Sequence, residues 1–299
     1  SEQEGIMFNA ANSLYLRGDT YGTVQAVSAY FDKFPTKPIY EKQARFIRAE
    51  SLVALGKPND AVADYNVILN DWTSAYTEKS LISMAKLYIA QKRYNDAIVY
   101  LKKLETTSEY KADYSFAINN LLLCYAQMNA PDDALKYAKL ILDYEKSSQE
   151  EKFKTGLYAG LAYLQKGDTT SAVKEFEYTV ANTKTIDAAE AKYNIANIEY
   201  RKRQYKTSQK TCFDLVKELP NYDYWVAKTF LLLADNYVAL KDDFQAKATL
   251  QSIIENYKGN DDILPAARQK LDAISPGGKR KAKPDTDQKA TPDTTNDAK

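Results

Sequence analysis

The side chains that most often carry enzymatic chemistry are sparse in this sequence. It contains no histidine among its 299 residues, which removes the commonest general base and the commonest metal ligand. It also lacks a Cys-x-x-Cys pair, a phosphate-binding glycine loop and a Gly-x-Ser-x-Gly turn. The adjacent carboxylates Asp132/Asp133 and Asp242/Asp243 stand at expected helix starts, where capping accounts for them. A carboxylate-only hydrolase is the one catalytic alternative left open. We expect no enzyme, no cofactor and no metal site.

Amide and aromatic side chains are the remaining candidates for a functional site, and they could bind another polypeptide. An asparagine amide both donates and accepts hydrogen bonds, so it suits an extended peptide backbone, although asparagine is a poor helix former. The candidate set combines amides with apolar and aromatic anchors and one carboxylate on predicted helices: Asn120, Leu123, Tyr158, Leu161, Asn194, Asn197, Tyr200 and Asp235. The alternative is that the asparagines face solvent or a neighbouring helix. Of the tyrosines, Tyr158, Tyr193 and Tyr200 are expected to be partly exposed.

Paired helices must position this set. Small or apolar residues twelve apart mark the expected closest approach of two helices, and the pattern occurs seven times: Ala11/Thr23, Ala49/Ala61, Ala85/Ala97, Leu122/Ala134, Gly160/Ala172, Ala196/Ser208 and Ala234/Ala246. Successive pairs are separated by 38, 36, 37, 38, 36 and 38 residues, so the length varies only in the connecting loops. Such self-similarity predicts an all-α solenoid of seven helix pairs, whose function lies on a surface.

Several positions of this pattern resemble tetratricopeptide repeats. Tyrosines follow four of the first anchors by three residues (Tyr88, Tyr125, Tyr163 and Tyr237), turn glycines stand at Gly18, Gly56 and Gly167, and prolines close two pairs at Pro35 and Pro220. The resemblance covers roughly residues 3–258 and implies a right-handed solenoid whose first helices line a concave, partner-binding groove. Arg48 and Glu199 depart from the family pattern, because large apolar residues are usual there, and Gly156 replaces a bulky one. The lysine, asparagine and arginine set that clamps a carboxyl terminus in the family is not reproduced.

Charge and hydropathy exclude other classes of partner. The formal net charge is +1, and no basic stripe of the kind that nucleic acids require is evident along the repeats. No run of about 20 apolar residues could span a membrane. Cys124 and Cys212 lie two repeats apart, so we expect two free, buried thiols.

The repeats set the expected domain boundaries. Residues 1–275 are predicted to form one array, ending in a capping helix over residues 261–274 with Leu264, Ala267, Leu271 and Ile274 on its buried edge. Residues 276–299 contain no Leu, Ile, Val or aromatic residue and are expected to be a disordered tail. Because no polar capping helix precedes the first pair, we expect further repeats before Ser1, in a larger chain or complex.

The expected function is a protein-interaction scaffold that binds a peptide or protein segment in the groove. The long repeats, rich in Tyr, Asn, Lys and Asp, resemble exported tetratricopeptide proteins of Gram-negative bacteria, which implies a periplasmic or outer-membrane-associated assembly role. The alternative is a cytoplasmic regulator that senses a signalling peptide. A nucleic-acid reader would require a basic groove.

Overall fold

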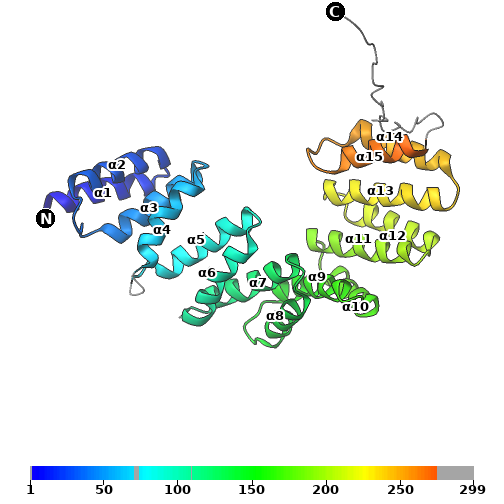
Figure 1. Cartoon of the computed structure of the whole chain (residues 1–299), viewed down its shortest axis with the longest axis horizontal. Helices are drawn as coiled ribbons and strands as arrows, with labels where there is room; N and C mark the ends of the chain where they lie inside the picture. The colour runs from blue at the N-terminus through cyan, green and yellow to red at the C-terminus, as the bar shows by residue number, and fades with distance from the viewer. Residues whose placement is uncertain (1, 71–73, 109, 275–299) are drawn as a thin grey trace, which may run out of the picture. The chain divides into compact units, whose positions relative to one another are not determined.

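The computed structural model describes residues 2–70, 74–108 and 110–274, and within them all regular structure is α-helical (Figure 1). The residues up to 202 and those from 203 onward form two compact units, which are described separately. The first unit contains α1 (Glu2–Leu16), α2 (Thr20–Lys33), α3 (Glu41–Ala54), α4 (Pro58–Leu69), α5 (Thr77–Ala90), α6 (Tyr94–Thr107), α7 (Lys111–Gln127), α8 (Pro131–Asp143), α9 (Gln149–Gln165), α10 (Thr169–Asn182) and α11 (Ile186–Arg201). The second contains α12 (Tyr205–Glu218), α13 (Asp223–Ala239), α14 (Asp243–Asn256) and α15 (Ile263–Ile274).

This order confirms the predicted fold class, a solenoid of helix pairs followed by one more helix. The expected tail, residues 276–299, lies outside the described residues. The single array over residues 1–275 stays a prediction.

The turn between the two helices of a pair has one geometry throughout. The residue seven after the first anchor has a positive φ in every pair: Gly18, Gly56, Lys92, Asn129, Gly167, Arg203 and Lys241. In six of the pairs the next backbone N–H donates to a carbonyl five residues earlier, as from Arg93 to the carbonyl of Tyr88 at 2.8 Å. This closing bond satisfies a carbonyl that the helix end would otherwise leave unpaired. The three glycines identified in the sequence therefore mark a turn that four other repeats build with less suitable residues.

Lys92→Gly is expected to stabilise the protein by about 1 kcal/mol, because a side chain at positive φ costs roughly this much and glycine avoids the cost. Lys92 has φ 57°. Gly167→Ala, at φ 78°, is the matched control and should destabilise by a similar amount. Urea denaturation of both variants gives the comparison. Equal midpoints for the two variants would contradict the turn assignment.

Small residues lie where helices approach one another, as predicted. Ala61, Ala97, Ala134 and Ala172 on the second helices are fully buried. On α9, a Cβ atom built on Gly160 would lie 2.4 Å from the ring of Phe176 on α10, and one on Gly156 would lie 2.9 Å from the backbone oxygen of Glu175. Close approach of α10 therefore explains both helical glycines, including the departure at Gly156.

A buried ion pair explains the departure at Arg48. Its guanidinium donates to both carboxylate oxygens of Asp64 on α4 at 2.7 Å, and Arg45 donates to the same carboxylate at 2.9 Å. The Asp64 side chain is only 2% exposed. Both guanidinium carbons also lie 4.8 Å from the ring centroid of Phe31. An arginine replaces the usual apolar residue here because α4 supplies its counter-charge and α2 supplies an aromatic face.

First helices contact one another in the first unit. Each second helix packs on the first helix of its own pair and on that of the next pair, and α5 contacts α7, α7 contacts α9, and α9 contacts α11. These four first helices therefore form a continuous wall, and four of the eight candidate residues lie on α7 and α9.

The last helix covers α13 and α14 in the second unit. Ile263 and Ala267 are its fully buried residues, while Leu264, Leu271 and Ile274 are only partly buried. On the same helix, Lys270 donates to Asp235 on α13 at 2.6 Å. Cys124 and Cys212 are free and buried, as predicted.

Candidate functional site

A hollow of about 790 Å³ lies between α7 and α9 and is called the α7/α9 groove here. Its lining comes from α7, from α9 and from the loop that precedes α9: Lys111, Ala112, Ser115, Phe116, Asn119, Asn120, Leu122, Leu123, Lys146, Ser148, Glu150, Glu151, Lys154, Thr155 and Tyr158. Asn120, Leu123 and Tyr158 were predicted from the sequence, and the structure brings these three together. The groove is thus a mixed apolar and polar surface on the first-helix wall.

Hydrogen bonds of Glu151 link the two helices that form the groove. Its Oε1 accepts hydrogen bonds from Ser115 at 2.7 Å and from Asn119 at 3.0 Å, both on α7. Its Oε2 accepts the Ser148 backbone N–H at 2.7 Å, while Ser148 Oγ accepts the Glu151 N–H, which completes a capping box. Burial acts to raise the pKa of Glu151, but the hydrogen bonds outweigh it and hold the pKa below its ordinary value. The carboxylate is therefore ionised and structural at neutral pH.

The asparagine side chains of α7 form some of their hydrogen bonds within their own helix. Asn120 Nδ2 donates to the Phe116 carbonyl at 2.7 Å, and Asn119 Nδ2 also donates to the Ser115 carbonyl at 2.9 Å. These bonds correspond to the alternative that the asparagines serve the helix itself. The Asn120 oxygen accepts no hydrogen bond from the described residues, and the side chain lines the groove and is only partly buried.

Tyr158 is more deeply buried than the sequence indicated. Only 9% of the residue is exposed, so the expectation of a partly exposed anchor is wrong at this position. Burial, together with the charges of Asp187 and Glu190, raises the pKa of its hydroxyl. One edge of Tyr158 lines the groove while the rest packs in the core. Tyr193 and Tyr200 on α11 are partly exposed.

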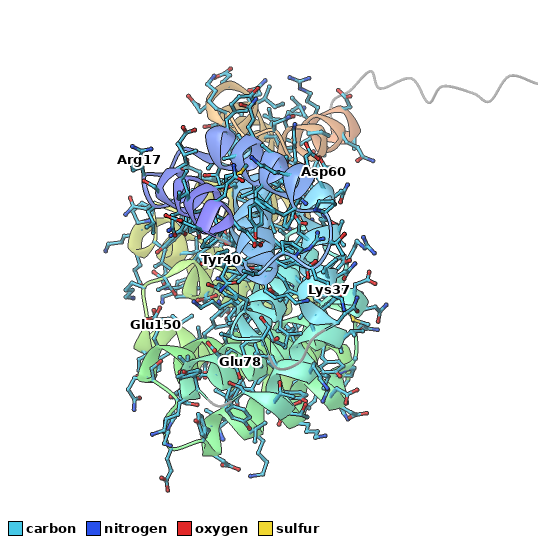
Figure 2. The ribbon with its side chains drawn as sticks, turned by 90° about the vertical axis from the view of Figure 1, so that its left-hand side faces the viewer. Arg17, Lys37, Tyr40, Asp60, Glu78 and Glu150 are labelled. Carbon is cyan, nitrogen blue, oxygen red and sulfur yellow. The ribbon has the colours of Figure 1, made fainter. Side chains whose placement is uncertain are left out.

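Three lysines stand around the groove. Lys111 begins α7, Lys146 lies in the loop before α9, and the Lys154 ammonium is 5.9 Å from the ring centroid of Tyr158. Contact with Lys146, and its charge, lower the pKa of Lys111. Glu150, labelled in Figure 2, is exposed in the first turn of α9. Positive charge therefore predominates among the groups that face solvent.

A second hollow continues along the first helices toward α3. It has a volume of about 570 Å³ and is lined by Glu50, Val53, Gly56, Pro58, Tyr65, Ser83, Lys86, Leu87, Ala90 and Gln91. Glu50 accepts hydrogen bonds from Tyr65 and from Ser83. Lys86 lines this hollow, and its ammonium lies 5.5 Å from the ring centroid of Phe116, which lines the α7/α9 groove. The two hollows are therefore neighbours on one surface.

The remaining predicted residues fall outside the α7/α9 groove. Leu161 on α9 packs partly against the core. Asn194, Asn197 and Tyr200 lie on α11, partly buried, and Asn194 donates to the Glu190 carbonyl at 2.9 Å. Asp235 belongs to the second unit, where it pairs with Lys270. The structure thus brings three of the eight candidates to one hollow.

Sequence reasoning missed Glu151, Ser115 and the groove lysines. Ser148-x-x-Glu151 is a capping-box pattern, so the sequence could have placed Glu151 at a helix start. Its bonds to α7 depend on packing between repeats, which no local signal reports. None of the three lysines belongs to the candidate set, and two of them lie at a helix start and in a loop.

The described part of the chain was searched for metal sites and for membrane-spanning helices. It holds no group of three or more His, Cys, Asp and Glu residues arranged to bind a metal ion. None of its helices is both long enough and apolar enough to cross a membrane.

Comparisons with known proteins agree with the fold. Residues 228–260 match the family model of the tetratricopeptide repeat. Comparison with curated protein sequences gives no match. The crystal structure of a tetratricopeptide repeat protein from Parabacteroides merdae ATCC 43184 aligns with a TM-score of 0.63 at 14% identity, covering 92% of this chain and 99% of that chain.

The quorum sensor NprR is similar in fold as well. Its apo form from B. thuringiensis aligns with a TM-score of 0.65 at 14% identity over 91% of this chain and 81% of that one. NprR in complex with its cognate peptide NprX gives a TM-score of 0.56 at 14% identity, over 91% and 82% of the two chains. At these identities the likeness shows a shared fold, the tetratricopeptide-like solenoid.

Proposed function

We propose that this tetratricopeptide-like solenoid is a protein-interaction scaffold that holds a segment of a partner protein in the α7/α9 groove. The observation that carries the proposal is the groove itself. It presents apolar side chains such as Phe116 and Leu123 beside an available amide oxygen on Asn120. A concave, mostly apolar surface with a few placed polar groups is what a bound peptide requires.

The groove also has the rigidity that binding requires. The Glu151 hydrogen bonds join α7 to α9, so the two walls are held before a partner arrives. Preorganisation of this kind reduces the ordering cost of association. The neighbouring hollow at Glu50 and Lys86 extends the surface, which favours an elongated segment over a compact ligand.

Leu123→Ala, with Asn120→Ala as a second variant, is expected to weaken partner binding about tenfold, because buried anchors near the centre of an interface carry most of its free energy. Affinity capture from the native cell, quantified by mass spectrometry with each variant as bait, identifies the partner, and titration with that partner gives the affinity. Lys174→Glu, on the exposed face of α10, is the control and should leave binding unchanged. Circular dichroism verifies equal helix content. If Lys174→Glu abolishes capture and the groove variants are silent, the partner binds the second helices instead.

Peptide sensing is a second candidate, favoured by the fold shared with NprR. That protein forms a complex with its cognate peptide NprX. A free signalling peptide would use the same groove as a protein segment. Saturable binding of a short synthetic peptide, copied from the captured partner, would therefore support peptide sensing. The alternative location in the cytoplasm goes with this function.

The envelope location implied by the sequence resemblance stays a prediction. Fractionation of the native cell, with the chain detected by antibody, tests it. Recovery in the cytoplasmic fraction alone would contradict it.

A further inference from the structure

The rim of the α7/α9 groove carries like charges side by side. Lys111 and Lys146 are both exposed and both line the groove, and the interaction with Lys146 lowers the pKa of Lys111. Lys154 stands across the groove over Tyr158. No described carboxylate forms an ion pair with any of the three. Ammonium groups that line one groove repel each other, and an anion between them would relieve that repulsion.

Some lysines elsewhere in the described residues have carboxylate partners. Lys139 pairs with Asp143, Lys210 with Asp214, and Lys270 with Asp235. At the groove, two carboxylates line the surface. The oxygens of Glu151 accept bonds from Ser115, Asn119 and the Ser148 backbone, and Glu150 is exposed and forms no ion pair with the three lysines. The groove lysines, which outnumber the carboxylates of the lining, can therefore pair with a charge that comes from outside this chain.

We propose that the segment bound in the α7/α9 groove is acidic, with an Asp or Glu carboxylate seated between Lys111 and Lys146 and an apolar residue placed against Phe116 and Leu123. The inference rests on the proposed function and names the chemistry of its partner. Charge complementarity would also fix the direction of the segment, because only one end of the groove carries the lysine pair.

The helix geometry sets the spacing within that segment. Lys111 precedes Phe116 by about 7 Å and Leu123 by about 18 Å along α7, at about 1.5 Å per residue. An extended chain advances about 3.3 Å per residue, so the carboxylate and the apolar anchor should be roughly two to five positions apart.

A phage-displayed library of random twelve-residue peptides, panned on the full chain, tests this pattern. Enriched peptides should contain Asp or Glu followed or preceded at that spacing by a large apolar residue. Fluorescein-labelled copies should bind about tenfold more weakly to Lys111→Glu/Lys146→Glu, and binding should weaken as sodium chloride is added, because exposed charges are screened. The control Lys139→Glu/Lys174→Glu makes the same change of charge on second helices and should leave affinity unaltered.

The outcomes separate this inference from the proposed function. Peptides that lack acidic residues but lose affinity with Leu123→Ala would overturn the acidic partner and leave the groove standing. The acidic partner would also be overturned if peptides with Asn and Gln in place of Asp and Glu bind equally well. Peptides indifferent to both sets of groove variants, or no enrichment at all, would overturn the groove as the binding site.

Discussion

Asp64→Asn is expected to lower the free energy of unfolding by about 3 kcal/mol, which is the low end of the cost of breaking a buried ion pair. The amide keeps the shape of the carboxylate but removes its charge and turns an N–H group toward a guanidinium. Arg48 and Arg45 then lack the counter-charge that α4 supplies. We place the effect at the low end because the two arginine side chains are 21% and 22% exposed and can recruit water.

Asp143→Asn is the matched control, measured by urea denaturation alongside Asp64→Asn. Its ion pair with Lys139 is 78% and 63% exposed at the two side chains, so its loss should cost under about 0.5 kcal/mol. The joint replacement Arg48→Met/Asp64→Leu should recover part of the stability, because apolar substitution of a buried pair is often close to neutral and Arg45 keeps its ion pair with Glu41. Similar losses for Asp64→Asn and Asp143→Asn would show that the buried pair contributes no more than a surface one.

Gly160→Ala should destabilise the protein by about 2 kcal/mol although alanine favours helices by about 1 kcal/mol. The added methyl group would lie 2.4 Å from the Phe176 ring, which is fully buried and cannot swing aside. A double-mutant cycle with Phe176→Leu measures the contact. The two changes together should cost less than their sum by about 1 kcal/mol or more, since the smaller side chain makes room for the methyl group.

Gly5→Ala in α1 makes the same substitution in open space. A Cβ atom there would meet only the Tyr40 hydroxyl, at 3.5 Å. It should stabilise by up to about 1 kcal/mol. If Gly160→Ala also stabilises, close packing of α9 on α10 would not be the reason for the glycine.

The helix pairs were predictable because their signals are local and recur. The fixed spacing of twelve locates every pair, and turn glycines or a tyrosine three after the anchor support most of them. The positive φ at Lys92 and Arg203 shows that the same turn forms without glycine. Arg48 could not be explained from the sequence because its partner, Asp64, belongs to another helix. Helix type and register follow from neighbouring residues, whereas a buried ion pair needs knowledge of what packs opposite.

The groove was less predictable for the same reason. Residue spacing placed Asn120 and Leu123 on the correct face of α7. It could not report that Tyr158 turns mostly into the core or that Asp235 pairs with the last helix. Long side chains reach partners on neighbouring repeats. Tertiary contacts therefore decide whether such a side chain faces solvent, packs in the core or forms an ion pair.

Because of the position of Glu151, partner binding in the groove and local unfolding of the start of α9 are thermodynamically coupled. Its carboxylate caps the start of α9 and also ties that start to α7, beneath the surface where a partner would lie. A ligand that binds only the closed form lowers the population of the frayed one, by mass action. Amide hydrogens in the first turns of α9 should then exchange with deuterium more slowly as ligand concentration rises. Occupancy could be followed by exchange rates at a helix end, with no label on either protein.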